Sequence, residues 1–218
     1  LMTNTTWDSV VMGSAWPLHS NKPLAYRAFE NIKAIGLPEW SEDDLTLAKA
    51  LQKEIGAEVI GLPEEIMPMV APPPLEKLTG GGSDDVGDIS WVVPTIFMLY
   101  PSNIPNLPGH NWSNAVSMAT PIAHKGIIAG AKAHAMTMID LFTDPSLLEE
   151  MDDYFTNTQT KDLKYESLLR EKDTPQIHLN EDIMGQYRDR MREFYYDAEK
   201  YDTYLQQLGI DYPTIRSE

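Results

Sequence analysis

Cysteine is absent from this 218-residue sequence. Its absence excludes disulfide scaffolds, thiolate zinc sites and cysteine nucleophiles together. Basic residues are also scarce, because 17 Lys and Arg stand against 33 Asp and Glu and give a formal net charge of −16. A surface of that charge repels phosphate backbones, so we expect no nucleic-acid partner.

Long hydrophobic runs are missing as well. No apolar run approaches the roughly 20 residues that a membrane helix needs, so we expect no membrane partner. Leu1 and Met2 are followed by polar residues, which is typical neither of a signal peptide nor of a natural start, and we therefore expect a piece of a longer protein. Hydrophobic residues make up 42% of the chain, as in a folded globular protein. The lack of cysteine fits a cytoplasmic location, which is the location we expect.

Helix start and stop residues predict several helices. The predicted helices cover residues 21–36, 41–56, 120–142 and 180–209, with a further short helix after Thr143. Ser41 and Asp44 have the spacing of a capping box. The last helix carries apolar residues every three or four positions from Ile183 to Leu205, which predicts one buried stripe.

Two apolar segments predict β-strands. Residues 1–15 are rich in Thr, Val and Trp, and are typical of a strand whose partners in a sheet lie elsewhere in the protein. Residues 89–100 form a second apolar segment, which Pro94 restricts to a sheet edge or divides into two short strands. The helix over residues 120–142 has one face of small side chains, which suits close packing on a sheet. The predicted fold class is therefore α/β.

Among the residues that can carry chemistry, His110 has the most informative context. The five histidines show no spacing that would place two ligands on one helix or strand, and a lone histidine is more often a surface or core residue than a ligand. His110, however, lies in a Pro/Gly loop between an apolar segment and a helix, where α/β proteins place their sites. The glycines at residues 80–82 can present backbone N–H groups to an anion, or can equally form a solvent-exposed turn.

Four longer strings are similar to a known family. Residues 82–95 resemble a signature of the aminobenzoyl-glutamate hydrolase-like branch of the zinc amidohydrolases, a family that also contains aminoacylases and glutamate carboxypeptidases. Three further stretches resemble the same branch in the same order: residues 34–40, residues 110–112, and residues 120–126 continuing to 140–145. The resemblance covers roughly residues 10–150.

The resemblance implies a protein of two domains, of which this chain supplies a part. Residues 1–15 would be the closing strand of a lid and dimerisation domain. Residues 16–150 would form the second half of a catalytic α/β domain with a mixed sheet flanked by helices, and residues 151–218 an acidic helical extension. The complete protein would bind two zinc ions per polypeptide and form a homodimer.

The resemblance also implies roles for individual residues. His110 matches the last metal-binding histidine of the family, and Asp85 and Asp88 match positions that support the ligands without binding metal themselves. The residues expected to line the substrate pocket are Gly81, Gly82 and Ser83. The family's His-x-Asp pair, bridging Asp and Glu-Glu pair lie upstream of the lid and have no counterpart here, so no catalytic residue is expected in this chain.

Two hypotheses of function follow. In the first, the chain is the C-terminal part of a two-metal amidohydrolase that cleaves a small N-acyl or aminobenzoyl amino-acid-type amide, and it is inactive without its N-terminal half or a companion chain. In the second, it is a truncated, non-catalytic relative that acts as a binding or assembly module, with the acidic C-terminal helix as its working surface.

Overall fold

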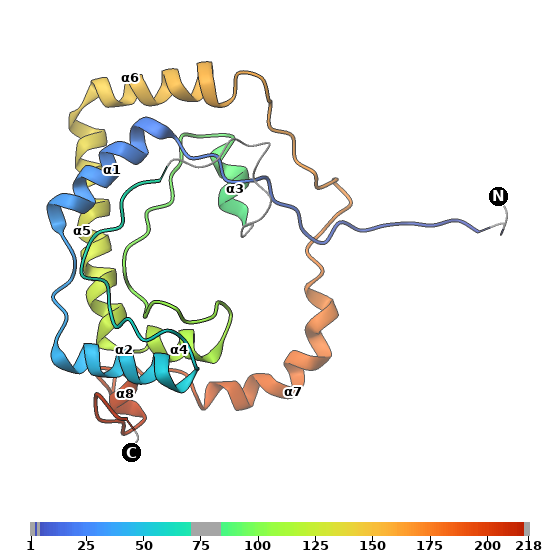
Figure 1. Cartoon of the computed structure of the whole chain (residues 1–218). Coiled ribbons are helices and arrows are strands. Elements are labelled where there is room, and N and C mark those ends of the chain that lie inside the picture. Colours follow the sequence, from blue (N-terminus) through green and yellow to red (C-terminus); the bar gives the residue numbers. More distant parts are fainter. Residues whose placement is uncertain (1–2, 4, 71–83, 216–218) are drawn as a thin grey trace. The chain divides into compact units, whose positions relative to one another are not determined.

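The computed structural model describes residue 3, residues 5–70 and residues 84–215 (Figure 1). These residues form helices and irregular segments, and no β-strand occurs among them. Contacts divide the chain into two compact units, each assembled from three separate stretches. Unit 1 comprises residues 1–21, 73–96 and 151–195, and unit 2 comprises residues 22–72, 97–150 and 196–218.

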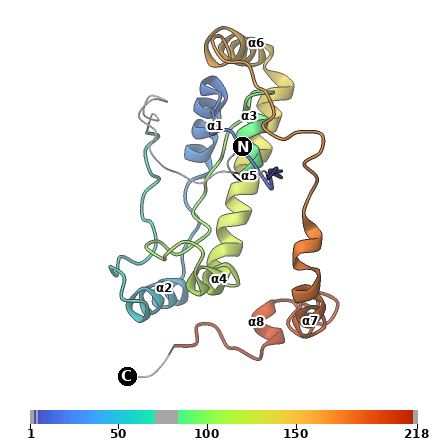
Figure 2. The ribbon, with the colours of Figure 1, turned by 90° about the vertical axis from the view of Figure 1, so that its right-hand side faces the viewer.

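Unit 2 is built mainly on two helices that run side by side (Figures 1 and 2). Its helices are α1 (Lys22–Ile35), α2 (Glu42–Glu54), α4 (Trp112–Met118), α5 (Pro121–Thr143), the first part of α6 (Pro145–Tyr154) and α8 (Tyr204–Gln207). α1 packs against α5, where the Asn31 amide donates to Thr137 Oγ1 at 3.0 Å and to the Asp140 carboxylate at 2.8 Å. The predicted helices corresponding to α1, α2, α5 and α6 are confirmed.

The predicted capping box of α2 is also confirmed. The Ser41 backbone N–H donates to the Asp44 carboxylate at 2.8 Å, and the Asp44 backbone N–H donates to Ser41 Oγ at 3.3 Å. Acidic residues fill the first turn, where the positive end of the helix dipole favours them. Local sequence therefore determines where α2 begins.

The small residues of α5 allow a close approach, but not to a sheet. Ala129 and Ala133 are buried, and so is Gly126. A Cβ atom on Gly126 would lie 2.2 Å from the Pro101 carbonyl oxygen, so the backbone of residues 101–102 lies directly against the helix. The face predicted to pack on a sheet packs only in part: Gly126 and Gly130 contact residues 100–102. Ile127, Ala131 and His134 of the same predicted face are exposed.

Unit 1 has a core of aromatic and amide side chains. It contains α3 (Asp85–Ser90), the end of α6, a π-helical turn (Phe155–Gln159), a 3₁₀ turn (Ile177–Asn180) and α7 (Glu181–Arg192). Trp91 is buried against Trp16 and His19, and its indole N–H donates to the Pro17 carbonyl at 2.8 Å. The buried Gln159 amide donates to the carbonyls of Ser90 and His19. Burial lowers the pKa of His19.

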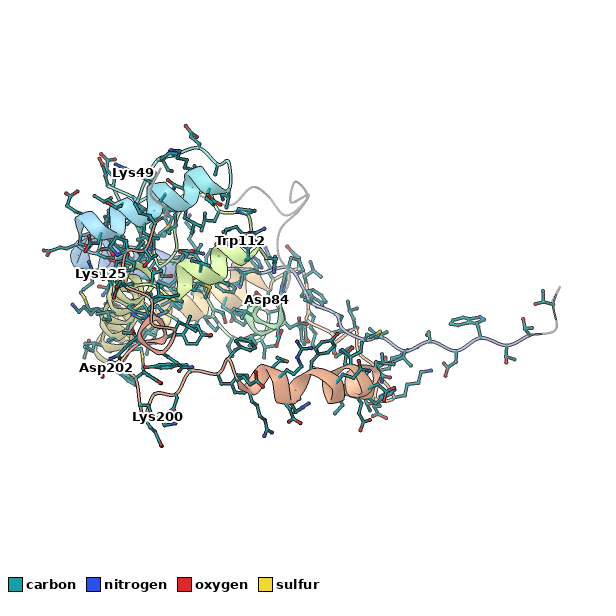
Figure 3. All side chains as sticks on the ribbon, turned by 90° about the horizontal axis from the view of Figure 1, so that it is seen from below. Lys49, Asp84, Trp112, Lys125, Lys200 and Asp202 are labelled. Carbon is teal, nitrogen blue, oxygen red and sulfur yellow. The ribbon has the colours of Figure 1, made fainter. Side chains whose placement is uncertain are left out.

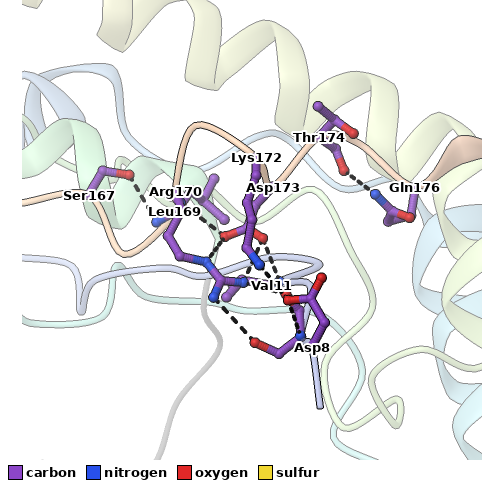
Figure 4. A network of polar contacts seen from close by, with 10 residues as sticks. Asp8, Val11, Ser167, Leu169, Arg170, Lys172, Asp173, Thr174 and Gln176 are labelled. Carbon is purple, nitrogen blue, oxygen red and sulfur yellow. Dashed lines mark hydrogen bonds and ion pairs between the residues drawn. The ribbon is translucent and has the colours of Figure 1, made fainter. Parts of the chain in front are cut away.

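The prediction of a strand over residues 1–15 is wrong for the described part of that segment. A strand needs a neighbouring strand to take its backbone hydrogen bonds. Here side chains take that role: the Val11 N–H donates to the Asp173 carboxylate at 3.1 Å, and Arg170 donates to the Ser9 carbonyl at 2.7 Å (Figure 4). The Arg170 guanidinium also binds Asp173 and holds the pKa of that carboxyl well below its usual range.

The prediction of strands over residues 89–100 is also wrong, because a short helix occupies the start of the segment. The Asp84 carboxylate accepts a hydrogen bond from the Val86 N–H at 3.1 Å and so caps α3, which continues through Ile89 and Ser90. Gly87 allows α3 to lie directly against the backbone of Trp16, since a Cβ at position 87 would lie 1.8 Å from the Trp16 carbonyl oxygen. Capping and close packing thus outweigh the β-propensity of the apolar residues.

The predicted helix over residues 180–209 is two helices with an irregular connection. α7 ends at Arg192, and α8 begins only at Tyr204. Local polar bonds interrupt the helix: the Asp197 carboxylate accepts from the Glu199 N–H at 3.2 Å, and Thr203 Oγ1 accepts from the Gln206 N–H at 3.1 Å to cap α8. The predicted buried stripe is wrong as well, because no residue of α7 is buried.

The predicted mixed sheet is therefore corrected to a helical arrangement in the described ranges. The apolar segments expected to form strands have their backbone groups bound by side chains and helix turns instead of by neighbouring strands. In the part of the chain that the structure covers, no helix is both long enough and apolar enough to cross a bilayer. The predicted domain boundaries at residues 15 and 150 stay predictions.

Candidate functional site

His110 lies in unit 2, on the irregular segment that leads into α4. Its side chain is exposed to solvent, and its backbone adopts the left-handed conformation with φ at 54°. Few residues other than glycine take this conformation, so the surrounding contacts must hold it. Asn106, four residues earlier, also has a positive φ of 61°.

The first anchor of this segment is Ile104, which is 2% exposed. Its side chain belongs to a core cluster with Ala48, Leu51, Leu62 and Ile122. Its backbone N–H donates to Ser117 Oγ of α4 at 2.9 Å. The segment is thereby held by apolar burial and by a hydrogen bond.

The second anchor is the Gln52 side chain, which is fully buried. Its amide nitrogen donates to the carbonyls of Gly61 at 3.1 Å and Pro105 at 3.0 Å. Its amide oxygen accepts from the backbone N–H groups of Ile60 at 3.1 Å and Gly61 at 2.9 Å. Gln52 therefore ties two irregular segments to α2, and one of them carries His110.

We expect Gln52→Leu to lower the free energy of unfolding by about 3 kcal/mol, because it leaves buried backbone groups without partners. The measurement is urea unfolding followed by circular dichroism. Gln186→Leu, at an exposed position of α7, is the matched control and should change stability by less than about 0.5 kcal/mol. Equal midpoints for Gln52→Leu and the wild type would contradict the anchoring role.

The third anchor consists of two asparagines that follow His110 in sequence. Asn111 caps α4, since its side-chain oxygen accepts from the Ser113 N–H at 3.0 Å. The Asn114 amide donates to the Pro108 carbonyl at 2.9 Å. The chain on both sides of His110 is thus held, and the exposed imidazole is presented from a fixed backbone. An imidazole placed in this way can bind a metal ion or transfer a proton.

The described residues do not themselves complete a metal site. No group of three His, Asp or Glu side chains suitable for a metal ion occurs among residues 3, 5–70 and 84–215. Catalytic zinc sites use three protein ligands, so His110 can supply one ligand at most and other donors must come from elsewhere. The donors among the described residues therefore do not fit a resident metal held by those residues alone.

The remaining predicted site residues lie outside the described ranges or belong to unit 1. Gly81, Gly82 and Ser83 lie outside the described residues. Asp85 is exposed in the first turn of α3 in unit 1, whereas His110 belongs to unit 2. The predicted roles of Gly81, Gly82, Ser83 and Asp85 therefore stay predictions.

Asp88, also in unit 1, is engaged within its own unit. One carboxylate oxygen accepts from the backbone N–H of Trp16 at 3.1 Å, and the other accepts from the Tyr165 hydroxyl at 2.9 Å. The hydrogen bond to Asp88 raises the pKa of Tyr165. Asp88 therefore connects three segments of unit 1.

Sequence reasoning missed a charged cluster at the start of α2. Asp44, whose side chain is fully buried, accepts from Lys125 Nζ of α5 at 2.6 Å and from the Tyr212 hydroxyl at 2.7 Å (Lys125 is labelled in Figure 3). Burial by itself would raise the pKa of Asp44, but the hydrogen bonds from Lys125, Ser41 and Tyr212 outweigh it and hold the pKa below its ordinary value. Burial and the Asp44 carboxylate raise the pKa of Tyr212. The capping-box spacing located Asp44, but nothing local indicated its two distant partners.

A hollow of about 390 Å³ in unit 2 lies between α4 and residues 196–204. Its lining residues are Ala115, Met118, Ala119, His124, Tyr196, Asp202, Thr203 and Tyr204. His110 is not among them, so this hollow is separate from the candidate site. Two of its residues, His124 and Asp202, could serve as metal ligands, which is fewer than a metal site needs.

Comparison with known proteins gives a relative for this chain. It is 28% identical over 171 residues to the B subunit of p-aminobenzoyl-glutamate hydrolase from Escherichia coli (strain K12), a match that covers 69% of this chain. The resemblance to the aminobenzoyl-glutamate hydrolase-like branch is confirmed. The chain spans 36% of the length of that relative. No family model matches the chain, and no solved structure matches it.

Proposed function

We propose that this chain is the C-terminal part of a metal-dependent amidohydrolase that cleaves an N-acyl or aminobenzoyl amino-acid-type amide. The observation that carries the proposal is the similarity to a p-aminobenzoyl-glutamate hydrolase over 69% of the chain. The rest of the enzyme, here called the companion portion, corresponds to the part of that relative outside the match. It would be a continuous segment or a separate chain of a cytoplasmic homodimer.

His110 would be this chain's contribution to the metal site, which we propose holds zinc. Its support is structural: the loop is anchored by Ile104, Gln52 and Asn111, while the imidazole is open to solvent. Because the described residues offer no group of three ligands, the other donors and the general base would come from the companion portion. We therefore propose that these 218 residues alone do not hydrolyse the amide.

The test is His110→Ala in the complete protein. We expect turnover of p-aminobenzoyl-glutamate to fall by at least about 100-fold, because a lost zinc ligand typically removes metal or misplaces it. Bound zinc, measured by mass spectrometry of the metal, should fall below that of the wild type. His178→Ala, at an exposed histidine of unit 1, is the matched control and should leave both quantities unchanged.

Unchanged turnover with the full metal content in His110→Ala would contradict the assignment. The intact mass of the native protein under denaturing conditions tests the rest of the proposal. A heavier chain or a second species would support a companion portion. A single species of 24.6 kDa would instead favour the non-catalytic binding or assembly module.

A further inference from the structure

α5 is apolar on two opposite faces. Residues at one side of the helix, including Ile122, Ala129 and Ala133, are buried within unit 2. The opposite side is exposed, and we call it the outer face of α5. Its members are Ile127, Ile128, Ala131, Ala135, Met138, Ile139 and Phe142.

The spacing of these residues places them on one continuous surface. Positions 127, 131, 135, 138 and 142 recur every three or four residues, so they line one side of the helix, with Ile128 and Ile139 beside them. Ile127, Ile128, Met138 and Ile139 are 55–59% exposed, and Phe142 is 82% exposed. At about 1.5 Å per residue, the surface extends along most of a 23-residue helix.

Polar side chains are confined to the margins of the outer face. Lys132 and His134 lie at its two edges and His124 at its N-terminal end, while Asp140 and Lys125 are half-buried on the other side of the helix. A helix that is hydrophobic all round is normally buried, and a large exposed apolar patch marks an interaction site. An apolar surface of this length calls for an apolar protein surface as its partner.

We propose that the outer face of α5 is the docking surface for an apolar face of the companion portion; this inference rests on the proposed function. The length of the relative favours that occupant. More than half of the relative lies outside the match, so a protein of this branch contains enough additional chain to cover a helix of this length. The outer face would then be an interior surface of the complete protein.

Because the sequence contains no cysteine, a single introduced cysteine is the only thiol that a maleimide can label in this chain, and its labelling tests the proposal. Ala135→Cys places one thiol at the middle of the outer face, and Glu149→Cys places one at an exposed position of α6 as the matched control. Labelling by a maleimide, located by peptide mass spectrometry, is compared in two samples of each variant. One is the 218-residue chain alone, and the other is the native protein purified from its source through an affinity tag on this chain.

In the chain alone, we expect the thiol at position 135 to be labelled as fast as the thiol at position 149. In the native protein, position 135 should be labelled on the order of 100-fold more slowly, with position 149 unchanged. Equal labelling of both positions in the native protein would overturn the proposal. Protection in the isolated chain that increases with its concentration would assign the face to a second copy, and protection only by phosphatidylcholine vesicles would assign it to a lipid surface. Either result would overturn the proposal too.

The proposed function and the proposed docking surface can be contradicted independently of each other. A native protein that protects position 135 but neither binds zinc nor cleaves p-aminobenzoyl-glutamate would retain the docking surface and contradict the proposed function. A native protein that cleaves the amide while position 135 reacts freely would retain the function and contradict the docking surface. A native sample with no polypeptide beyond 24.6 kDa would overturn both.

Discussion

Gly126→Ala should lower the free energy of unfolding by at least about 3 kcal/mol, or prevent unit 2 from folding. The added Cβ would lie 2.2 Å from the Pro101 carbonyl oxygen and 2.4 Å from Ser102 Cα. Both atoms belong to the backbone, so no side-chain rotation can relieve the overlap. α5 would have to move away from the segment that leads to His110. Thermal and urea unfolding followed by circular dichroism measure the loss.

Gly185→Ala is the matched control for this prediction. Gly185 also lies within a helix, α7, but nothing lies within 4 Å of a Cβ built there. We expect this variant to be more stable than the wild type by about 0.5–1 kcal/mol, because alanine favours a helix interior. A similar loss of stability in both variants would show that the close approach at Gly126 is not the cause.

Asp44→Ala should lower the free energy of unfolding by about 3 kcal/mol. The substitution removes the capping box of α2 and the carboxylate that accepts from Lys125 and Tyr212. The Lys125 ammonium keeps its hydrogen bond to the Glu39 carbonyl but loses its buried counter-charge. Asp43→Ala, one residue away on the same helix, is exposed and should cost less than about 0.5 kcal/mol. Urea unfolding followed by circular dichroism measures both. Comparable losses in the two variants would indicate that the buried contacts of Asp44 are not the cause.

The contribution of Asp44 should also depend on pH in a defined direction. Its pKa in the folded protein is below the ordinary value of 3.8, because the bonds from Lys125, Ser41 and Tyr212 outweigh the effect of burial. A carboxyl with a lowered pKa stabilises the fold fully above its unfolded pKa and loses that effect as the pH falls through its folded pKa. The stability difference between the wild type and Asp44→Asn should be constant from pH 7 to about pH 5 and should shrink below about pH 4. A difference that grows on acidification would contradict this assignment.

The helices of unit 2 could be predicted from the sequence because their determinants are local. Ser41 with Asp44 and Pro121 after Thr120 are start signals that act within one turn, and the structure shows α2 and α5 beginning at these points. The apolar segments could not be assigned in this way, since a strand depends on a partner that sequence alone does not locate. Over residues 5–15, the backbone instead binds the Asp173 and Arg170 side chains, more than 150 residues away.

In the candidate site, too, the locally determined features could be predicted from the sequence, and the contacts with distant residues could not. The Pro/Gly context predicted that His110 lies in a loop, and it does. Nothing local predicted that the loop would be tied to α2 through Gln52, because a glutamine in a helix is normally a surface residue. The small residues of α5 correctly indicated close packing, whereas their partner, the backbone of residues 101–102, depended on the tertiary fold.

The anchoring of the His110 loop has a consequence for the entropy of ligand binding. A loop that becomes ordered only when its ligand arrives loses roughly 1–2 kcal/mol of backbone conformational freedom per residue at that moment. Around His110 that loss is incurred during folding, since Ile104, Gln52 and Asn111 hold the backbone before any ligand is present. A ligand of the His110 imidazole therefore binds to a loop that is already ordered. Its affinity should not be reduced by the entropy cost of ordering that loop.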